Sequence, residues 1–269
     1  MMAEQRALVV GISGCSSSGK TTLARLLRDI FPGTFILHED DFYKPEEQLP
    51  IKDGLVDWDC AEAISIPDME RSLAHIRSAG TFPPDLSSKE DQNSIGACPA
   101  SEERIAAARR RVKEWLSPPY AGHAIFFSSS AAPPNICLLD GFLLYSPKLM
   151  PSIMAAIDIK LFLLVSREKA TRRREARDGY VTLEGFWKDP PGYVDKIVWP
   201  NYAAAHSYLF DDDSGDVERG VLDGEKVKEK YGILVPEGGN QADMPFADVL
   251  DWAVGTLMSE LERILLKRE

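Results

Sequence analysis

Cysteine is scarce in this chain, and the few cysteines are not grouped. The 269 residues include Cys15, Cys60, Cys98 and Cys137, without a Cys-x-x-Cys pair, and the four histidines do not cluster. This spacing excludes the common structural zinc motifs and is typical of reduced thiols. It therefore indicates a cytoplasmic protein, with the nucleus as the alternative compartment.

Long hydrophobic runs and an excess of positive charge are also missing. No run approaches the roughly 20 apolar residues that a membrane span requires, and only a few polar residues precede the first apolar run. We therefore expect neither a membrane span nor a targeting segment. The formal net charge of -11 argues against general affinity for nucleic acid or anionic membranes. Any phosphate must be held by local positive groups.

A glycine-rich motif near the N-terminus lies between an apolar run and a helical pattern. Residues 11 to 22 read GISGCSSSGKTT and contain Gly-x-x-x-x-Gly-Lys-Thr, the phosphate-binding loop. Gly14 and Gly19 let backbone N–H groups face an anion, Lys20 adds positive charge, and Thr21 offers a hydroxyl to Mg²⁺. A glycine- and serine-rich linker is the alternative, but the flanking strand and helix patterns argue against it. We expect ATP phosphates to contact Gly14, Ser16, Ser17, Ser18, Gly19, Lys20, Thr21 and Thr22.

The order of apolar patterns predicts an α/β fold. Residues 7 to 12 indicate a buried strand, residues 21 to 30 a helix, and residues 34 to 38 a second strand. Later strand patterns follow, and residues 246 to 265 show helical spacing. We predict a five-stranded parallel sheet flanked by helices, with ligands beyond the carboxyl ends of the strands.

Acidic residues follow two of the predicted strands. Glu39, Asp40 and Asp41 would repel one another unless a cation or a hydroxyl donor lies nearby. A carboxylate there can accept the proton of a hydroxyl that attacks a γ-phosphoryl group, or hold a metal through water. Asp140 ends another apolar run, a pattern typical of an acid that orients Mg²⁺. A solvated acidic turn and a helix or turn cap are the alternatives.

Trp58 lies between two acids, Asp57 and Asp59, which is unusual for a core residue. An indole in this place can stack against a flat cationic ring, while Asp59 accepts hydrogen bonds from sugar hydroxyls. Packing of the indole under a loop, with the acids turned to water, is the equal alternative.

An arginine cluster follows the strand pattern at residues 157 to 165. Arg173, Arg174 and Arg177 lie within one helical turn, so at least two guanidinium groups can point into one cleft. Such groups suit the charge that spreads over a transferring phosphoryl group. A nuclear-import signal, an RNA-binding patch and a solvated helix face are the alternatives.

Residues 80 to 135 differ from the rest in composition. They are rich in Pro, Ser and Ala and contain one charged helical run at residues 102 to 116. We expect a partly disordered surface insert, too polar to bury a core of its own, within a single domain of residues 1 to 269. A second polar and acidic stretch, residues 211 to 229, is expected to be exposed.

Taken together, these motifs resemble those of the nicotinamide riboside kinases, within the uridine kinase-like group of P-loop kinases. The resemblance covers residues 7 to 79 and 136 to 208. The phosphate-binding loop is generic to the superfamily, whereas the later elements are more particular. They are Asp40-Asp41-Phe42-Tyr43-Lys44-Pro45, Asp57-Trp58-Asp59, Asp140-Gly141-Phe142, Arg172-Arg173-Arg174, and Pro191-Gly192-Tyr193 with Val198-Trp199-Pro200.

The resemblance implies a P-loop nucleoside kinase that transfers the γ-phosphoryl group of ATP to the 5′-hydroxyl of nicotinamide riboside. It implies catalysis by Asp40 as base with Lys20, and Mg²⁺ near Thr21 with Asp40 or Asp140. Arg173 and Arg177 would close over ATP, and the adenine-side turn would lie near Glu237-Gly238. The implied substrate contacts are Asp40, Asp41, Phe42, Tyr43, Trp58, Asp59 and Arg174, with Asp40 and Asp59 at the ribose and Trp58 and Tyr43 at the nicotinamide ring.

Two other functions stay open at this point. A uridine or cytidine kinase would place a neutral pyrimidine against Trp58, and a nucleotide-binding regulator would lack turnover. The chain has no Asn-Lys-x-Asp guanine motif, which argues against a GTPase-type switch. The expected partners are a small nucleoside and ATP, without nucleic acid or membrane.

Overall fold

A five-stranded parallel sheet forms the centre of the computed structural model, in the order β2-β5-β1-β6-β9. The structure describes residues 6–93, 96–128, 133–177, 179–182, 185–210, 222–236 and 241–266. The strands are β1 (Ala7–Gly14), β2 (Thr34–His38), β5 (Asn135–Gly141), β6 (Ile159–Leu163) and β9 (Ile233–Leu234). The predicted fold class is confirmed.

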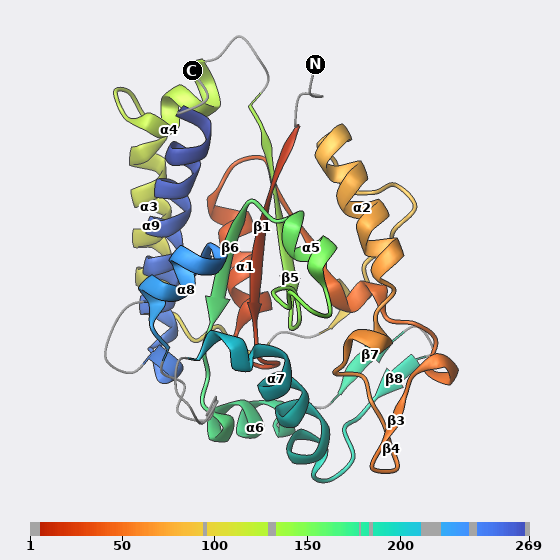
Figure 1. Cartoon of the computed structure of the whole chain (residues 1–269). Helices are drawn as coiled ribbons and strands as arrows, with labels where there is room; N and C mark the ends of the chain where they lie inside the picture. The colour runs from red at the N-terminus through yellow and green to blue at the C-terminus, as the bar shows by residue number, and fades with distance from the viewer. Residues whose placement is uncertain are drawn as a thin grey trace.

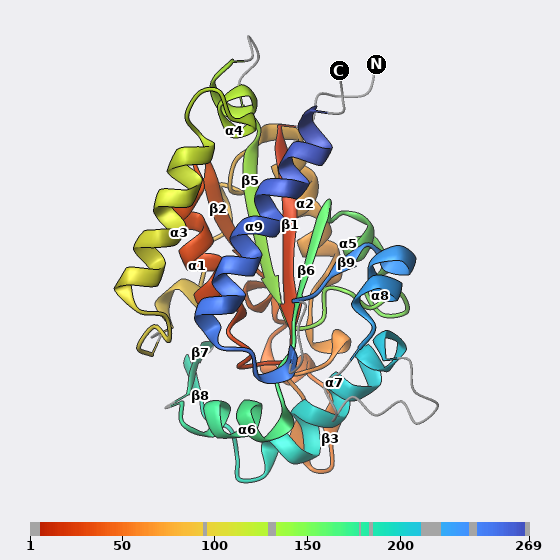
Figure 2. The same cartoon turned by 90° about the vertical axis from the view of Figure 1, so that its left-hand side faces the viewer.

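Helices cover both faces of the sheet, as Figures 1 and 2 show. Alternate side chains of β1 point to opposite faces, so Leu8 and Val10 enter one core while Ala7 and Val9 enter the other. The helices α1 (Lys20–Ile30), α3 (Glu102–Trp115) and α9 (Phe246–Leu265) pack over the first core. Over the second core lie α2 (Ile66–Ala79), α5 (Pro151–Ala155), α7 (Trp199–His206) and α8 (Gly224–Tyr231).

Helix α2 shows how local sequence sets these boundaries. Pro67 lies in its first turn, where its missing N–H costs no hydrogen bond. Met69, Leu73 and Ile76 recur at helical spacing, and all three are buried against the sheet. Gly80 ends the helix with a φ of 76° and donates its N–H to the Ile76 carbonyl.

Short elements gather beyond the carboxyl ends of the strands, at the bottom of Figure 1. They are α6 (Arg167–Glu175) and the hairpins β3 (Ile51–Lys52) with β4 (Leu55–Val56) and β7 (Tyr180–Thr182) with β8 (Gly185–Trp187). The β7–β8 hairpin was not predicted from the sequence. These elements surround the edge at which the fold predicts ligands.

Helix α3 lies within the segment that we expected to be a surface insert. Ile105, Ala108, Val112 and Trp115 are buried on one face of this helix, which packs on α1 and α9. The Trp115 indole also donates a 2.6 Å hydrogen bond to Glu262. This part of the segment therefore completes a layer of the fold, because its four apolar residues share one helix face, while Arg104 pairs with Asp248 and Asp251 on α9 and the other charged residues are exposed. The short helix α4 (Ala121–His123) follows it.

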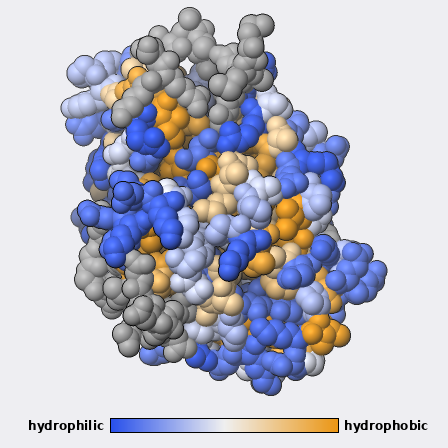
Figure 3. Space-filling model, viewed as in Figure 1, coloured by the Kyte–Doolittle hydropathy of each residue, from blue (hydrophilic) through white to orange (hydrophobic). Residues whose placement is uncertain are grey.

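Some of the predicted features lie outside the described residues. They are residues 94, 95 and 129 to 132 of the expected insert, residues 211 to 221 of the acidic stretch, and the turn near Glu237-Gly238. In the part of the chain that the structure does describe, no helix is both long and apolar enough to cross a bilayer. On the face seen in Figure 3, hydrophobic residues form separate groups between hydrophilic ones.

We predict that Trp115→Ala lowers the free energy of unfolding by about 3 to 5 kcal/mol, because it leaves a cavity beside Phe31 and Phe126. Arg110→Ala, on the exposed face of the same helix, should change it by less than about 0.5 kcal/mol. Urea denaturation of the three proteins measures both values. Equal stabilities for the two variants would show that α3 is not part of the cooperative core.

Candidate active site

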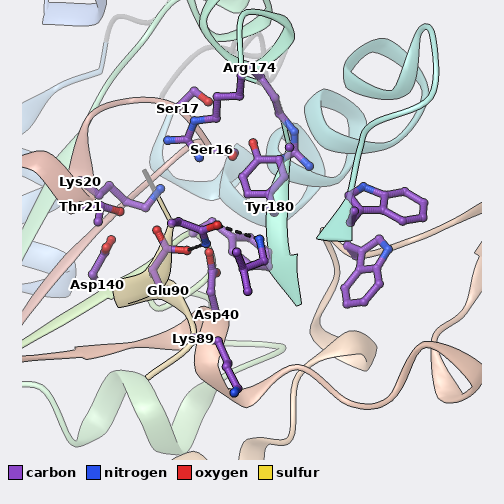
Figure 4. Close-up of a pocket in the computed structure, with 18 of the residues that line it drawn as sticks. Ser16, Ser17, Lys20, Thr21, Asp40, Lys89, Glu90, Asp140, Arg174 and Tyr180 are labelled. Carbon is purple, nitrogen blue, oxygen red and sulfur yellow. Dashed lines mark hydrogen bonds between the residues drawn. The ribbon is translucent and has the colours of Figure 1, made fainter. Parts of the chain in front are cut away.

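One cavity of about 340 Å³ opens at the carboxyl edge of the sheet. Its volume lies in the range of small-molecule sites. It is lined by the loop after β1, the residues after β2 and β5, helix α6 and the β7–β8 hairpin (Figure 4). Of the residues predicted for the site, it brings together Ser16, Ser17, Gly19, Lys20, Thr21, Thr22, Asp40, Asp41, Tyr43, Trp58, Asp59, Asp140, Arg174 and Arg177.

The glycine-rich loop begins where β1 and β6 come too close for any side chain. A Cβ on Gly14 would lie 2.3 Å from the Leu163 carbonyl oxygen, and the residue has a φ of 145°. Ser17 and Gly19 also have positive φ values, so the backbone curls before α1 starts at Lys20. Lys20 donates from Nζ to the Cys15 carbonyl oxygen at 3.1 Å. The loop thus places an ammonium group at the N-terminus of a helix, where anions bind well.

Asp140 lies at the end of β5, level with His38 on β2. Its Oδ2 is 3.2 Å from His38 Nδ1, and the Thr21 hydroxyl also bonds to it. Burial alone would raise the pKa of Asp140, but the bonds from His38 and Thr21 and the charge of Lys20 lower it. Burial opposes the charge on His38, yet Asp140 raises the pKa of this histidine to about 9. The pair holds an ionised carboxylate beside the Thr21 hydroxyl.

The three consecutive acids after β2 lie in different surroundings. Glu39 is fully buried and accepts the Phe142 and Leu143 N–H groups at 2.6 and 3.1 Å. Burial raises its pKa to about 7. Asp41 accepts two other backbone N–H groups through Oδ1. Asp40 and Asp41 line the cavity, whereas Glu39 does not.

Asp40 occupies a crowded electrostatic position. Desolvation raises its pKa well above the ordinary value, and the negative charges of Glu90 and Asp140 add to this effect. Lys20 acts in the opposite direction. A carboxylate with a raised pKa is a stronger base, so Asp40 is suited to accept a proton from a bound hydroxyl.

Aromatic side chains line the opposite end of the cavity. Trp58 packs edge-on against Tyr43, with 5.2 Å between ring centroids, and tilted against Trp187 at 5.6 Å. Its backbone N–H donates to the Tyr193 hydroxyl at 2.9 Å. Trp58 is 5% exposed, so it both packs in a cluster and lines the cavity. The packing alternative was wrong about the acids, because Asp57 and Asp59 are buried and bonded to Asn201 and Arg174 instead of facing water.

Arg174 forms ion pairs with two acids, Asp59 and Asp189, near the aromatic end of the cavity. It forms two hydrogen bonds with Asp59, at 2.8 and 3.0 Å, and two with Asp189, at 2.6 and 3.2 Å. The guanidinium is 6% exposed, and although burial lowers its pKa, Asp59 and Asp189 raise it well above the ordinary value. Asp189 also accepts the Trp187 indole N–H at 3.0 Å. One buried cation thereby orients the acid and the tryptophan that line the cavity.

The other two arginines of the cluster take separate positions. Arg173 donates from Nη1 to the Ser17 and Ser18 carbonyl oxygens, at 3.2 and 3.4 Å, and lines a small neighbouring pocket with Ser18. Arg177 lies over the Tyr180 ring at 5.2 Å from its centroid and lines the main cavity. Arg173 therefore contacts the glycine-rich loop directly, whereas Arg177 lines the cavity that this loop borders.

Four of the predicted contact residues do not line the main cavity, namely Gly14, Ser18, Phe42 and Arg173. Phe42, predicted as a substrate contact, is 4% exposed. Its side chain is buried in the core, because the turn from Glu39 to Phe42 rotates it inward while Asp40 faces the cavity.

Several lining residues were missed in the sequence. Glu90 and Asn93 come from the expected insert, and Tyr180 and Trp187 from the hairpin. Burial raises the pKa of Glu90. Charged and polar residues are ordinary in such segments, so no local pattern marks these as part of a site. Arg25, Lys44, Lys89, Gly96, Gly141, Phe142, Ala176, Gly179 and Val181 complete the lining.

Comparison with known proteins gives a consistent set of relatives. The nicotinamide riboside kinase of Schizosaccharomyces pombe is 36% identical over 258 residues, which cover 96% of this chain and 99% of that protein. The Saccharomyces cerevisiae nicotinamide riboside kinase is 33% identical over 93% of this chain and 95% of its own length. Nicotinamide riboside kinase 2 of Homo sapiens is 31% identical over 83% of this chain and 76% of its own length. No protein-family model matches the chain.

We predict that Arg174→Ala destabilises the protein by about 3 to 5 kcal/mol, because Asp59 and Asp189 would lose their shared counter-charge in a buried place. Arg172→Ala should cost less than about 0.5 kcal/mol, since that side chain is 71% exposed and 3.9 Å from Glu168. Chemical denaturation of both variants measures the difference. A small loss for Arg174→Ala would show that the network does not hold the fold at this edge.

Proposed function

The chain belongs to the nicotinamide riboside kinase family, and we propose that it transfers the γ-phosphoryl group of ATP to the 5′-hydroxyl of nicotinamide riboside, forming nicotinamide mononucleotide. One observation carries this proposal. A single cavity joins a phosphate-binding loop, the carboxylate of Asp40 and an aromatic wall that contains Trp58. We also propose that residues 1 to 269 form one kinase domain.

The loop and its neighbours are suited to hold ATP phosphates. Backbone N–H groups at the start of α1 and the Lys20 ammonium attract the anionic phosphates, as in other P-loop enzymes. Arg177 lines the cavity and Arg173 contacts the loop backbone. Both supply positive charge in a protein of net charge -11.

The residues around Thr21 fit a magnesium ion. Thr21, Asp40 and Asp140 offer oxygen ligands, which Mg²⁺ prefers, and the mutual repulsion of Asp40 and Asp140 favours a cation between the phosphates and these acids. Among the described residues, no group of three or more acids, histidines or cysteines is arranged to hold a metal alone. This suits Mg²⁺, which usually takes one or two carboxylates together with substrate phosphates. When bound, the ion would neutralise charge on the transferring phosphate.

Asp40 is the proposed base. Its carboxylate accepts the proton of the 5′-hydroxyl as this oxygen attacks the γ-phosphorus, and the proton stays on the carboxyl group until the product leaves. Lys20 remains near the phosphates and stabilises the charge on their oxygens. Most of the rate enhancement in such a reaction comes from positioning and charge neutralisation, which this arrangement supplies.

The nicotinamide end of the substrate fits the aromatic wall. Its pyridinium ring is flat and cationic, and the faces of indole and phenol rings attract such cations. Trp58 and Tyr43 are held at nearly a right angle to each other, so one can face the ring while the other touches its edge. Asp59, fixed by Arg174, accepts hydrogen bonds from the ribose hydroxyls.

Release of ADP from Mg-ATP tests the proposal, with nicotinamide riboside, uridine, cytidine or no acceptor present. We expect turnover with nicotinamide riboside well above that with either pyrimidine nucleoside. A preference for uridine or cytidine would overturn the account of Trp58 while retaining Asp40 as base. ATP binding without acceptor-dependent turnover would favour a regulatory protein.

Asp40→Asn should reduce kcat by about 10² to 10⁴-fold, because the amide cannot accept the hydroxyl proton. ATP binding, measured by calorimetry, should stay within about twofold because the loop is unchanged. Asp53→Asn is the matched control, since this exposed residue has a φ of 51°, which asparagine also adopts. Equal turnover for both variants would remove Asp40 from its role.

A further inference from the structure

A short turn from the expected insert reaches into the catalytic cavity. Lys89, Glu90 and Asn93 all line it. The Lys89 and Glu90 N–H groups donate to Asp41 Oδ1 at 2.7 and 3.0 Å, and Arg25 on α1 donates to the Glu90 carbonyl oxygen at 3.3 Å. The turn is therefore bonded both to the acidic stretch after β2 and to the helix of the nucleotide loop.

Glu90 places its carboxylate among the reacting groups. The side chain is 8% exposed, and its charge acts on both Asp40 and Asp140. Figure 4 shows Glu90 between Asp140 and Asp40, on the side of Lys20 and Thr21. A buried carboxylate in this position needs a fixed orientation, because a small movement would change the field at Asp40.

Asn93 supplies that orientation and also bonds to a second element. Its Nδ2 donates to Glu90 Oε2 at 2.6 Å, and its Oδ1 accepts the Val181 N–H at 2.7 Å. Val181 belongs to β7 of the hairpin that carries Tyr180 and Trp187 into the cavity. One amide thus joins the carboxylate at the phosphoryl-transfer end to the hairpin at the aromatic end.

We propose that Asn93 is a positioning residue for the nucleoside, acting through Glu90 and through the β7–β8 hairpin, so that Glu90 and Asn93 are part of the acceptor site. The identity of the acceptor in this inference rests on the proposed function. The Asn93 side chain bonds to Glu90 through its donor and to Val181 through its acceptor. It thereby sets the distance between the phosphoryl-transfer end and the aromatic end of the cavity. The nucleoside has to span that distance.

Steady-state kinetics of the full-length protein test this role. Asn93→Ala should raise the KM for nicotinamide riboside about tenfold, because two hydrogen bonds are lost, one of them to a charged group. The KM for ATP should change less than about twofold, since the loop contacts are retained. Gln92→Ala is the matched control, because the side chain of this exposed neighbour donates to the Ser88 carbonyl oxygen, away from the cavity lining, and its loss should leave both KM values unchanged.

Exchanging the donor and the acceptor of the hydrogen bond between Asn93 and Glu90 distinguishes a positioning role from a general effect on stability. Asn93→Asp keeps the oxygen that accepts the Val181 N–H but loses the donor to Glu90 and adds a like charge. Combining it with Glu90→Gln provides an amide donor on the other partner. The nucleoside KM of the double variant should fall below that of Asn93→Asp alone. Melting temperatures of all variants are measured in parallel.

The inference is overturned if Asn93→Ala and Gln92→Ala share the same nucleoside KM, or if Asn93→Ala lowers only the melting temperature. Failure of the proposed function gives a different result. If the wild type prefers uridine or cytidine, the same comparison is made with that nucleoside and still decides the role of Asn93. If no nucleoside is turned over, quenching of tryptophan fluorescence reports binding, and no binding would overturn the role.

Discussion

Negative charge concentrated at one edge of the sheet is the constraint that the rest of this site has to satisfy. Glu39, Asp40, Asp140 and Glu90 all lie there, in a chain that already carries a net charge of -11. The fold separates their tasks. Glu39 accepts two backbone N–H groups, Asp140 is paired with His38, and Asp40 lines the cavity. The site is thus organised by where each acid finds its hydrogen-bond donor.

The aromatic end of the cavity is also organised by hydrogen-bond partners, and there the central group is a buried cation. Arg174 neutralises Asp59 and Asp189, and Asp189 in turn fixes the Trp187 indole. Trp58 is held by its neighbours Tyr43 and Trp187. Because these side chains already hold one another in place, a flat ring can bind without the entropy cost of ordering them. Affinity for a ring then comes from its contacts, with little loss to rotamer entropy.

Local sequence predicted the fold and much of the site, and the reasons are visible in particular residues. The strand, loop and helix around Lys20 form a contiguous motif, and Asp40 and Asp140 follow their strands directly, so spacing alone brings them to one edge. The burial of Phe42 was not predicted, because the turn after β2 is a tight helical one, which the alternation of apolar and polar residues does not reveal. Glu90 and Asn93 are held at the cavity by hydrogen bonds to residues far away in the chain, and Trp187 packs there against Trp58. The periodicity of the local sequence does not reveal such long-range contacts.

The close approach at Gly14 has a consequence for motion. Where a side chain would meet the Leu163 carbonyl oxygen, the start of the loop is wedged between two central strands and has no room to swing. The β7–β8 hairpin, by contrast, forms a separate two-stranded sheet, and it contacts the rest of the site through Trp187 against Trp58 and through the hydrogen bond from Val181 to Asn93. The wall of the cavity at the glycine-rich loop is therefore built on the central sheet itself, whereas the wall at the hairpin is held by a few long-range contacts.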